Sequence, residues 1–237
     1  PEINDAMAKV GFREGTYEQK MPAPIDIDVK QRVKNIFIDG DLSEWQGLEG
    51  IELVAPRYLE FGEVLGPDDF SSALRFLWDD EYLFFCAEVR DDILFTRRSA
   101  EAIYKNDCLE FFFDPEGDGL EWNNPKDVQI GMSPRFNAEA PYVNGWAWFQ
   151  NVDPVKSKDL MVSTTQTDGG YIIEGALRWS FVQVSPQTDA IIPMSPAFND
   201  VDQNGKNEAK VNLFFQDVTG KDALKKLARM RLRSETF

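Results

Sequence analysis

Short runs of alternating apolar and polar residues, separated by turn-forming residues, recur along most of this chain. In the run over residues 82–89, Leu83, Phe85 and Val89 fall on one side of an extended backbone. Successive side chains of a β-strand point to opposite faces, so this alternation predicts a strand with one buried face. A second strand is expected over residues 72–78, directly before it.

The same pattern continues through "DCLEFFFDP", where Leu109, Phe111 and Phe113 share the face expected to be buried. Helical signals are confined to "SAEAIY" and "DALKKLA". Many short strands joined by turns predict an all-β fold, an antiparallel β-sandwich of two packed sheets with few short helices. Residues 34–237 are expected to form this domain. Residues 1–33 lack sustained periodicity and are interpreted as an extended arm or linker.

The composition excludes several classes of function. The chain contains no histidine, which rules out a Ser-His-Asp triad and His-ligated zinc. The net charge of −16 disfavours nucleic acid as a partner, because an acidic surface repels phosphate backbones. No apolar run approaches the roughly 18–20 residues that span a bilayer, so membrane insertion is not expected. The cysteines, Cys86 and Cys108, are either buried thiols or a disulfide between neighbouring strands.

Five motifs occur in an order that is typical of one family. They are "IDGDLSEW", "LRFLWDDEYLFFCAEVRDD", "NDCLEFFFDP", "DGGYIIEGALRW" and "FNDVDQNGK". In this order, over residues 34–233, the chain resembles the carbohydrate-binding module family 9-like domains. The resemblance implies a β-sandwich with structural calcium ions and a slot that holds a sugar between two aromatic side chains.

The resemblance also implies roles for particular residues. The slot aromatic that precedes the "DCLEFF" strand corresponds to Tyr104, and the carboxylate on that strand corresponds to Glu110. An arginine of the family corresponds to Gly131, and a polar glutamine falls near Ala197. The segment that should carry the second slot aromatic, residues 217–228, contains none.

These departures predict weaker sugar binding, or a second ring supplied from another loop. Trp122 lies among Gly, Asn and Pro residues, which favours an exposed loop position. Trp146 and Trp148 project to one side of a strand-like segment, where they either pack in the core or offer flat faces to a pyranose ring. Tyr104, Glu110, Trp122 and Trp146 are therefore the candidate carbohydrate-binding residues.

The segment "AFNDVDQNGKNEAKV" spaces Asp200, Asp202 and Asn204 two residues apart. Carboxylate and amide oxygens are the ligands that calcium prefers. Val211 stands where a helix-loop-helix calcium site would place a glutamate, so that type of site is excluded. The three residues predict either a calcium site or a turn that satisfies its own backbone. A second acidic loop, "DPEGDG", is interpreted as solvated.

The expected function is a non-catalytic carbohydrate-binding module for a plant or microbial polysaccharide or its oligosaccharides. The alternative is a protein-interaction or adhesion module of the same fold without sugar binding. With 41 acidic residues, carboxylate pairs at glycosidase-like separations arise by chance, and no motif singles out a catalytic pair. The location is expected to be secreted or periplasmic, with a signal peptide removed.

Overall fold

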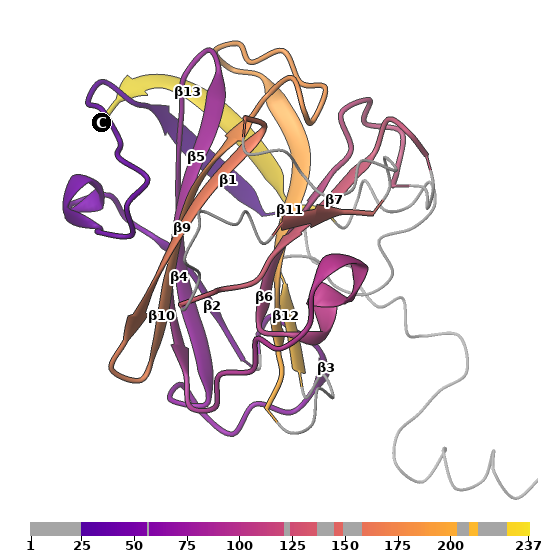
Figure 1. The fold of residues 1–237 in the computed structure, drawn as a ribbon. Helices are drawn as coiled ribbons and strands as arrows, with labels where there is room; N and C mark the ends of the chain where they lie inside the picture. The colour runs from indigo at the N-terminus through magenta and orange to yellow at the C-terminus, as the bar shows by residue number, and fades with distance from the viewer. Residues whose placement is uncertain are drawn as a thin grey trace, which may run out of the picture.

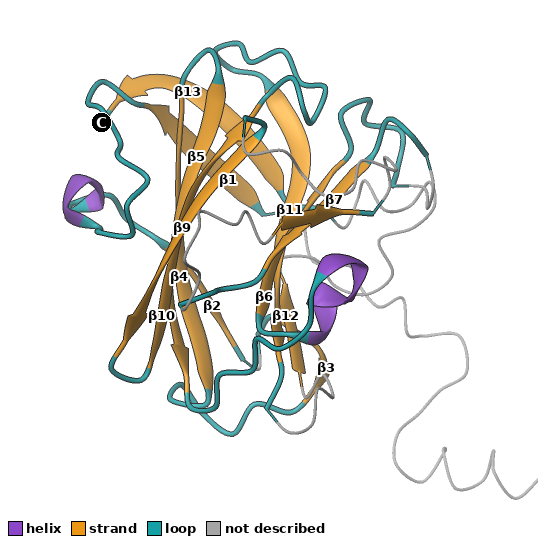
Figure 2. Cartoon of the chain, viewed as in Figure 1, coloured by secondary structure: helices purple, strands orange, loops and turns teal. Residues whose placement is uncertain are grey.

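The computed structural model describes residues 25–55, 57–120, 124–136, 145–148, 158–202, 209–212 and 227–237. In these ranges the chain forms β-strands and two short 3-10 helices (Figure 1, Figure 2). The elements are β1 (Asp26–Gln31), η1 (Ser43–Trp45), β2 (Ile51–Val54), β3 (Leu59–Gly62), β4 (Phe70–Trp78), β5 (Tyr82–Asp91), η2 (Ala100–Lys105), β6 (Cys108–Phe113), β7 (Val128–Met132), β8 (Gly145–Ala147), β9 (Leu160–Thr167), β10 (Gly170–Arg178), β11 (Ile191–Asp200), β12 (Ala209–Asn212) and β13 (Arg229–Thr236).

The strands form two facing layers (Figure 1). One layer runs β2-β4-β5-β10-β9 and the other runs β8-β7-β6-β11-β12-β3. β13 and β1 connect the layers at one end, because β13 pairs with the start of β11 while β1 pairs with both β13 and β4. The expected β-sandwich is confirmed. One detail differs, since β1 runs parallel to both of its neighbours and the sheet is therefore mixed.

β1 lies inside the segment expected to be an arm or linker. Ile27 and Val29 are buried, and in the parallel register they face Met230 and Leu232 of β13. Residues 26–31 thus belong to the sandwich, which begins before residue 34. The partner strand lies about 200 residues along the chain, so the local sequence of β1 gave no sign of this pairing. The rest of the expected arm, up to residue 24, falls outside the described residues.

Aromatic side chains fill the space between the layers. The ring of Phe111 meets Phe85 edge-on at 4.9 Å between centroids and lies 5.8 Å from the ring of Phe76 on the facing layer. Edge-to-face pairs of this kind stabilise beyond the area they bury. The core positions expected from the alternation are all buried: Leu83, Phe85, Val89, Leu109, Phe111 and Phe113.

The "IDGDLSEW" motif has a structural role in the described chain. Its tryptophan, Trp45, is buried and donates a 2.8 Å hydrogen bond from Nε1 to Glu174 on β10. The same carboxylate accepts from the backbone N–H of Gly40 at 2.8 Å and of Asp39 at 3.0 Å. A single buried glutamate therefore anchors the loop against the outer face of the first layer. Trp78 and Trp179 are also buried.

The two cysteines are free and buried. Cys86 lies on β5 in one layer and Cys108 on β6 in the other. Burial raises the pKa of the Cys86 thiol to about 12. Of the two alternatives left open by the sequence, the structure has the buried thiols.

Candidate functional site

An exposed aromatic ring lies outside the layer formed by β6, β7 and β8. Tyr104, in η2, is 41% exposed. The ring of Trp148, just after β8, meets it edge-to-face at 6.2 Å and an interplanar angle of 74°. The ammonium of Lys105 lies 5.5 Å from the centroid of the Tyr104 ring. An exposed ring of this kind can pack against the C–H face of a sugar.

Glu110 lies on the outward face of β6, as its alternation predicts, yet it is only 1% exposed. Its Oε2 forms a 2.7 Å ion pair with Nζ of Lys210 on β12, and its Oε1 accepts a long 3.5 Å hydrogen bond from Gln129. The cross-strand neighbour of Glu110 on β11 is Ala197, and Lys210 on β12 lies opposite Asn199 of β11. Glu110 is thus paired with Lys210 and shielded from solvent.

Lys210 retains its charge in this setting. Burial alone lowers the pKa of its ammonium, but the negative charge of Glu110 and the hydrogen bond to it raise the pKa above the ordinary value. A lysine ammonium has three N–H donors, and Glu110 accepts one of them among the described residues. The ammonium also lies 5.3 Å from the centroid of the Phe112 ring. Lys210 is therefore a fixed cationic donor on the same layer as Tyr104.

A row of outward-facing positions connects these residues across the second layer. Trp146 on β8 pairs with Gly131 on β7, Gly131 pairs with Glu110 on β6, and Glu110 pairs with Ala197 on β11. Residues opposite one another in antiparallel strands share a face of the sheet. The structure therefore brings Glu110 and Trp146 onto one surface, where Trp146 is partly buried. Trp122 falls outside the described residues.

Two residues of this surface, Lys210 and Gln129, carried no signal in the sequence. Lys210 and Gln129 reach Glu110 only through the register of β12 and β7, which no local pattern indicates. Gln129 is 7% exposed and its Oε1 has no hydrogen-bond partner among the described residues. Trp148 carried a usable signal, because it lies two residues after Trp146 and therefore on the same side of an extended chain.

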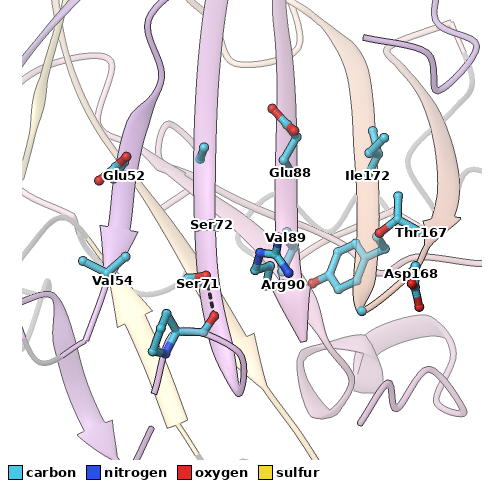
Figure 3. A pocket seen from close by; sticks show the side chains of 14 residues that line it. Glu52, Val54, Ser71, Ser72, Glu88, Val89, Arg90, Thr167, Asp168 and Ile172 are labelled. Atoms are coloured by element: carbon cyan, nitrogen blue, oxygen red, sulfur yellow. Dashed lines mark hydrogen bonds between the residues drawn. The ribbon is translucent and has the colours of Figure 1, made fainter. Parts of the chain in front are cut away.

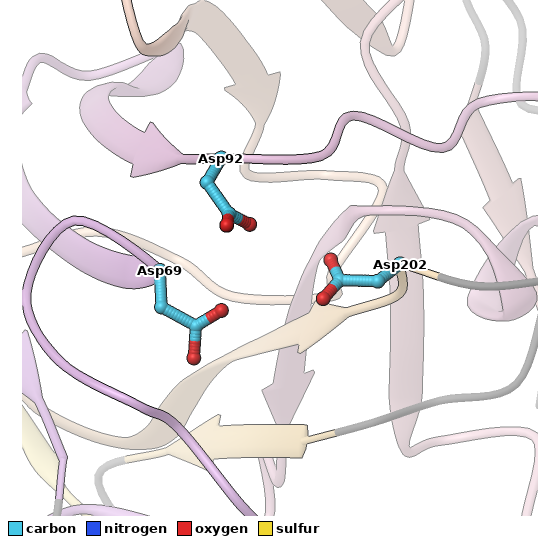
Figure 4. A group of neighbouring side chains, drawn as sticks. All are labelled: Asp69, Asp92 and Asp202. Carbon is cyan, nitrogen blue, oxygen red and sulfur yellow. The ribbon is translucent and has the colours of Figure 1, made fainter.

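Carboxylates from the two layers converge where β5 and β11 end. Asp200 ends β11 and Asp202 follows it, and Asp91 ends β5 with Asp92 directly after it. Oxygens of Asp91, Asp200 and Asp202 lie within 4.8 Å of one another, and so do oxygens of Asp69, Asp92 and Asp202 (Figure 4). Asp202 belongs to both groups. Asn204, the third residue of the sequence motif, lies outside the described residues.

Two carboxyls of this acidic cluster have strongly raised pKa values. Burial, and then the charges of Asp91 and Asp202, raise the pKa of Asp200 to about 8. Burial raises the pKa of Asp91 to about 7, with Asp202 and Asp92 adding to the shift. Oδ1 of Asp200 and Oδ2 of Asp91 are buried without a hydrogen-bond partner among the described residues. Buried carboxylate oxygens without partners fit a hard divalent cation.

The second acidic loop is partly as expected. Glu116 and Asp118 are exposed, and Glu116 pairs with Lys126 at 2.6 Å. Asp114, however, is buried, and its carboxylate accepts hydrogen bonds of 2.8 Å from the backbone N–H of Gly117 and of Gly119. These bonds close the turn after β6, so the loop is solvated at its tip and ordered at its base.

A groove of about 480 Å³ crosses the outer face of the other layer (Figure 3). Its sides carry Glu52 on β2, Glu88 and Arg90 on β5, and Asp168 beside the β9–β10 turn. Among the described residues that line it, Tyr171 is the one aromatic side chain, and it is buried. The groove therefore offers no ring face for a sugar, and it lies on the layer opposite Tyr104.

In the part of the chain that the structure describes, helices are too short or too polar to cross a bilayer.

Comparisons with known proteins identify the fold and the family. A structure of a carbohydrate binding module family 9 from Caldicellulosiruptor kristjanssonii in complex with cellotriose superposes with a TM-score of 0.62, at 18% identity, covering 88% of this chain and 94% of that one. A second structure, in complex with glucose, matches equally, with a TM-score of 0.62. At this identity the likeness establishes the shared fold.

Curated relatives match in sequence over part of their length. An exoglucanase from Acetivibrio thermocellus, XynX, is 30% identical over 143 residues, which is 60% of this chain and 12% of the relative. An endo-1,4-beta-xylanase A from Thermotoga maritima is 26% identical over 170 residues, 71% of this chain and 14% of the relative. This chain thus spans only a small part of the length of these relatives.

The family description that matches residues 38–223, most of the chain, is "Carbohydrate family 9 binding domain-like". It covers every motif named above, from "IDGDLSEW" to the loop after β11. The chain therefore belongs to the carbohydrate family 9 binding domain-like family and is a non-catalytic carbohydrate-binding module.

Proposed function

We propose that this module binds β-1,4-linked glucan or xylan chains and their oligosaccharides, at the surface that carries Tyr104 and Lys210. The observation that carries the proposal is the exposed ring of Tyr104 on the same layer as the fixed ammonium of Lys210. The names of the relatives, an exoglucanase and a xylanase, support these two polymers. Because such polymers cannot cross a membrane, a secreted or periplasmic location follows from the proposal.

The contacts expected at the site are those of a neutral sugar. The Tyr104 ring packs on the apolar C–H face of one pyranose, and the remaining N–H donors of Lys210 bind hydroxyl oxygens. Glu110 acts as a positioning residue, because it fixes the ammonium of Lys210. None of these contacts requires an anionic ligand, which is consistent with the net charge of −16.

Affinity for the sugar is expected to be modest. One stacking face and a few hydrogen bonds correspond to a Kd of about 10 μM to 1 mM, or roughly −7 to −4 kcal/mol. Calorimetry with cellotriose, xylotriose and mannotriose measures it. Tyr104→Ala should lower the affinity at least about tenfold without changing Tm, because the side chain is exposed.

Two results of this titration would contradict the proposal. If Tyr104→Ala binds as tightly as the parent, the site lies elsewhere. If the parent binds none of the three trisaccharides or their polymers, sugar binding is lost and the protein-interaction alternative takes its place.

We also propose a structural calcium ion at the acidic cluster. Asp91, Asp200 and Asp202 would hold it, with Asp69 and Asp92 close enough to complete a set of oxygens and Asn204 as a further candidate. Calcium takes six to eight oxygen ligands, so a crowded carboxylate cluster suits it. Because Asp91 ends β5 and Asp200 ends β11, the ion would join the two layers.

Thermal melting tests the calcium proposal. An ion that binds the folded state alone adds about 2.7 kcal/mol when its concentration is about 100 times its Kd. For a domain of this size that raises Tm by roughly 5–11 °C. Asp202→Ala should remove the difference between calcium and EDTA, whereas Glu52→Ala, an exposed carboxylate on β2, should keep it. Identical melts of the parent in calcium and in EDTA would exclude the ion.

A further inference from the structure

The indole of Trp148 occupies the space above the backbone of Gly131. A Cβ placed on Gly131 would lie 2.5 Å from Cη2 and 2.8 Å from Cζ3 of that ring, well inside van der Waals contact. Gly131 is the cross-strand neighbour of Glu110 on the outer face of the second layer. The indole therefore lies directly beside the Glu110–Lys210 ion pair. It can do so only because residue 131 has no side chain.

Trp148 also connects this surface to Tyr104. Its Nε1–H donates a 3.0 Å hydrogen bond to the backbone carbonyl of Glu101 in η2. Its ring meets that of Tyr104 at 74° and 6.2 Å between centroids. On the inner side it packs against a small apolar cluster that includes Phe112 and Ala197. The ring is thus held in one orientation by a hydrogen bond, by a ring contact and by packing, and it remains partly exposed.

The angle between the two rings decides how a sugar can fit. A pyranose held between two parallel rings needs an optimal separation of about 3.5–4 Å on each side, so the rings must stand roughly 7–8 Å apart. Tyr104 and Trp148 are closer than this and nearly perpendicular. No sugar ring fits between them. They form a corner, in which one pyranose can rest its C–H face on one ring and its edge on the other.

We propose that Trp148, seated on the bare backbone of Gly131, is the second aromatic wall of the sugar site and forms this corner with Tyr104. The ligand it serves is one pyranose ring of a neutral glycan, with hydroxyls directed to Lys210. This inference rests on the proposed function. It assigns the second ring to a residue other than Trp122 and Trp146, the two expected from the sequence.

Two substitutions test the corner from opposite sides. Trp148→Ala removes the wall and should lower the affinity for cellotriose or xylotriose, whichever the parent binds, at least about tenfold. Gly131→Ala keeps the tryptophan but places a Cβ where the indole lies, so it should displace the ring and weaken binding by a similar factor. Phe37→Ala is the matched control, because it removes a 60% exposed aromatic ring outside this surface and should leave the affinity unchanged.

Trp148→Phe keeps an aromatic ring at this position. It distinguishes direct contact between the indole and the sugar from a purely structural role of Trp148. It should bind within about threefold of the parent, yet lose most of the change in tryptophan emission that the sugar produces. A purely structural Trp148 would leave that change intact, because its indole would not contact the sugar. The variant also keeps the proposal testable if Trp148→Ala fails to fold.

The outcomes separate the two proposals. Loss of affinity in Trp148→Ala and Gly131→Ala, with the emission change lost in Trp148→Phe, supports the corner. If Tyr104→Ala loses binding while both Trp148→Ala and Gly131→Ala bind as the parent does, the corner is wrong and the proposed sugar site stands. If the parent binds neither trisaccharide, the proposed function and the corner fail together.

Discussion

Raising the pH from 5 to 8 in the presence of EDTA should destabilise this protein. The carboxyls of Asp91 and Asp200 are buried close to one another, and their pKa values in the folded chain are about 7 and about 8. In the unfolded chain both return to the ordinary value of 3.8. The folded protein therefore holds protons over this pH range that the unfolded protein has released.

The sign and size of the effect follow from linkage. Where the folded state binds more protons than the unfolded state, the free energy of unfolding falls as the pH rises. Each carboxyl that stays protonated contributes about 1.4 kcal/mol per pH unit between its two pKa values. For Asp200 the window runs from 3.8 to about 8, so this residue alone accounts for about 4 kcal/mol at most between pH 5 and 8.

Urea unfolding at pH 5, 6, 7 and 8 measures this dependence, in EDTA and in calcium. The chain has no histidine, so no ordinary side chain titrates in this range and the slope reports the perturbed carboxyls. Asp200→Asn is the matched variant, because it keeps the shape and removes the proton. Its slope in EDTA should be shallower by about 1.4 kcal/mol per pH unit.

Calcium should make the free energy of unfolding depend less on pH, because it binds the ionised carboxylates and its stabilisation grows as the pH rises. A free energy of unfolding in EDTA that stays constant or increases from pH 5 to 8 would refute the reasoning. So would an equal slope in the parent and in Asp200→Asn. Either result would mean that the cluster is ionised in the folded protein without an ion.

Three further substitutions test the fold. Phe111→Ala should cost about 3–5 kcal/mol in urea unfolding, because its ring is fully buried against Phe85; a loss below about 1 kcal/mol would contradict the packing. Glu174→Ala should cost at least about 2 kcal/mol, since it leaves Trp45 Nε1 and two backbone N–H groups without their acceptor; an unchanged Tm would show that this loop is not anchored there. Gly170→Ala should cost more than about 1 kcal/mol, because φ is +151° and a Cβ would lie 2.0 Å from the carbonyl oxygen of Val89; thermal melting equal to that of the parent would argue against this turn geometry.

The sequence by itself determined the strands over residues 72–78, 82–89 and 108–113, their core-facing sides and the family, but it did not predict β1. Alternation over residues 82–89 and 108–113 specified which side chains enter the core, because side-chain direction in a strand has a period of two. Five ordered motifs were enough to indicate the family, which the match over residues 38–223 establishes. The exposed position of Tyr104 beside β6 was also accessible, since it precedes a recognisable strand.

The acidic cluster was accessible only in part. The spacing of Asp200 and Asp202 indicated an ion site in the sequence. Asp69, Asp91 and Asp92 come from segments more than 100 residues away and could not be predicted as members of the cluster. Which strand ends meet at one edge of a sandwich can be predicted only when the order of the strands is known. The raised pKa values follow from that convergence and from burial, and neither is a property of a local sequence.

Tertiary structure alone decided the composition of the sugar surface. Lys210 reaches Glu110 through the register of β12, β11 and β6, and Trp148 covers Gly131 because that residue has no Cβ. The parallel pairing of β1 with β13 was likewise decided by the tertiary structure, because the two strands are far apart in the sequence. Local sequence sets which face of a strand a side chain occupies, but the register between distant strands sets its neighbours across the sheet. The polar and aromatic contacts of this module depend on that register.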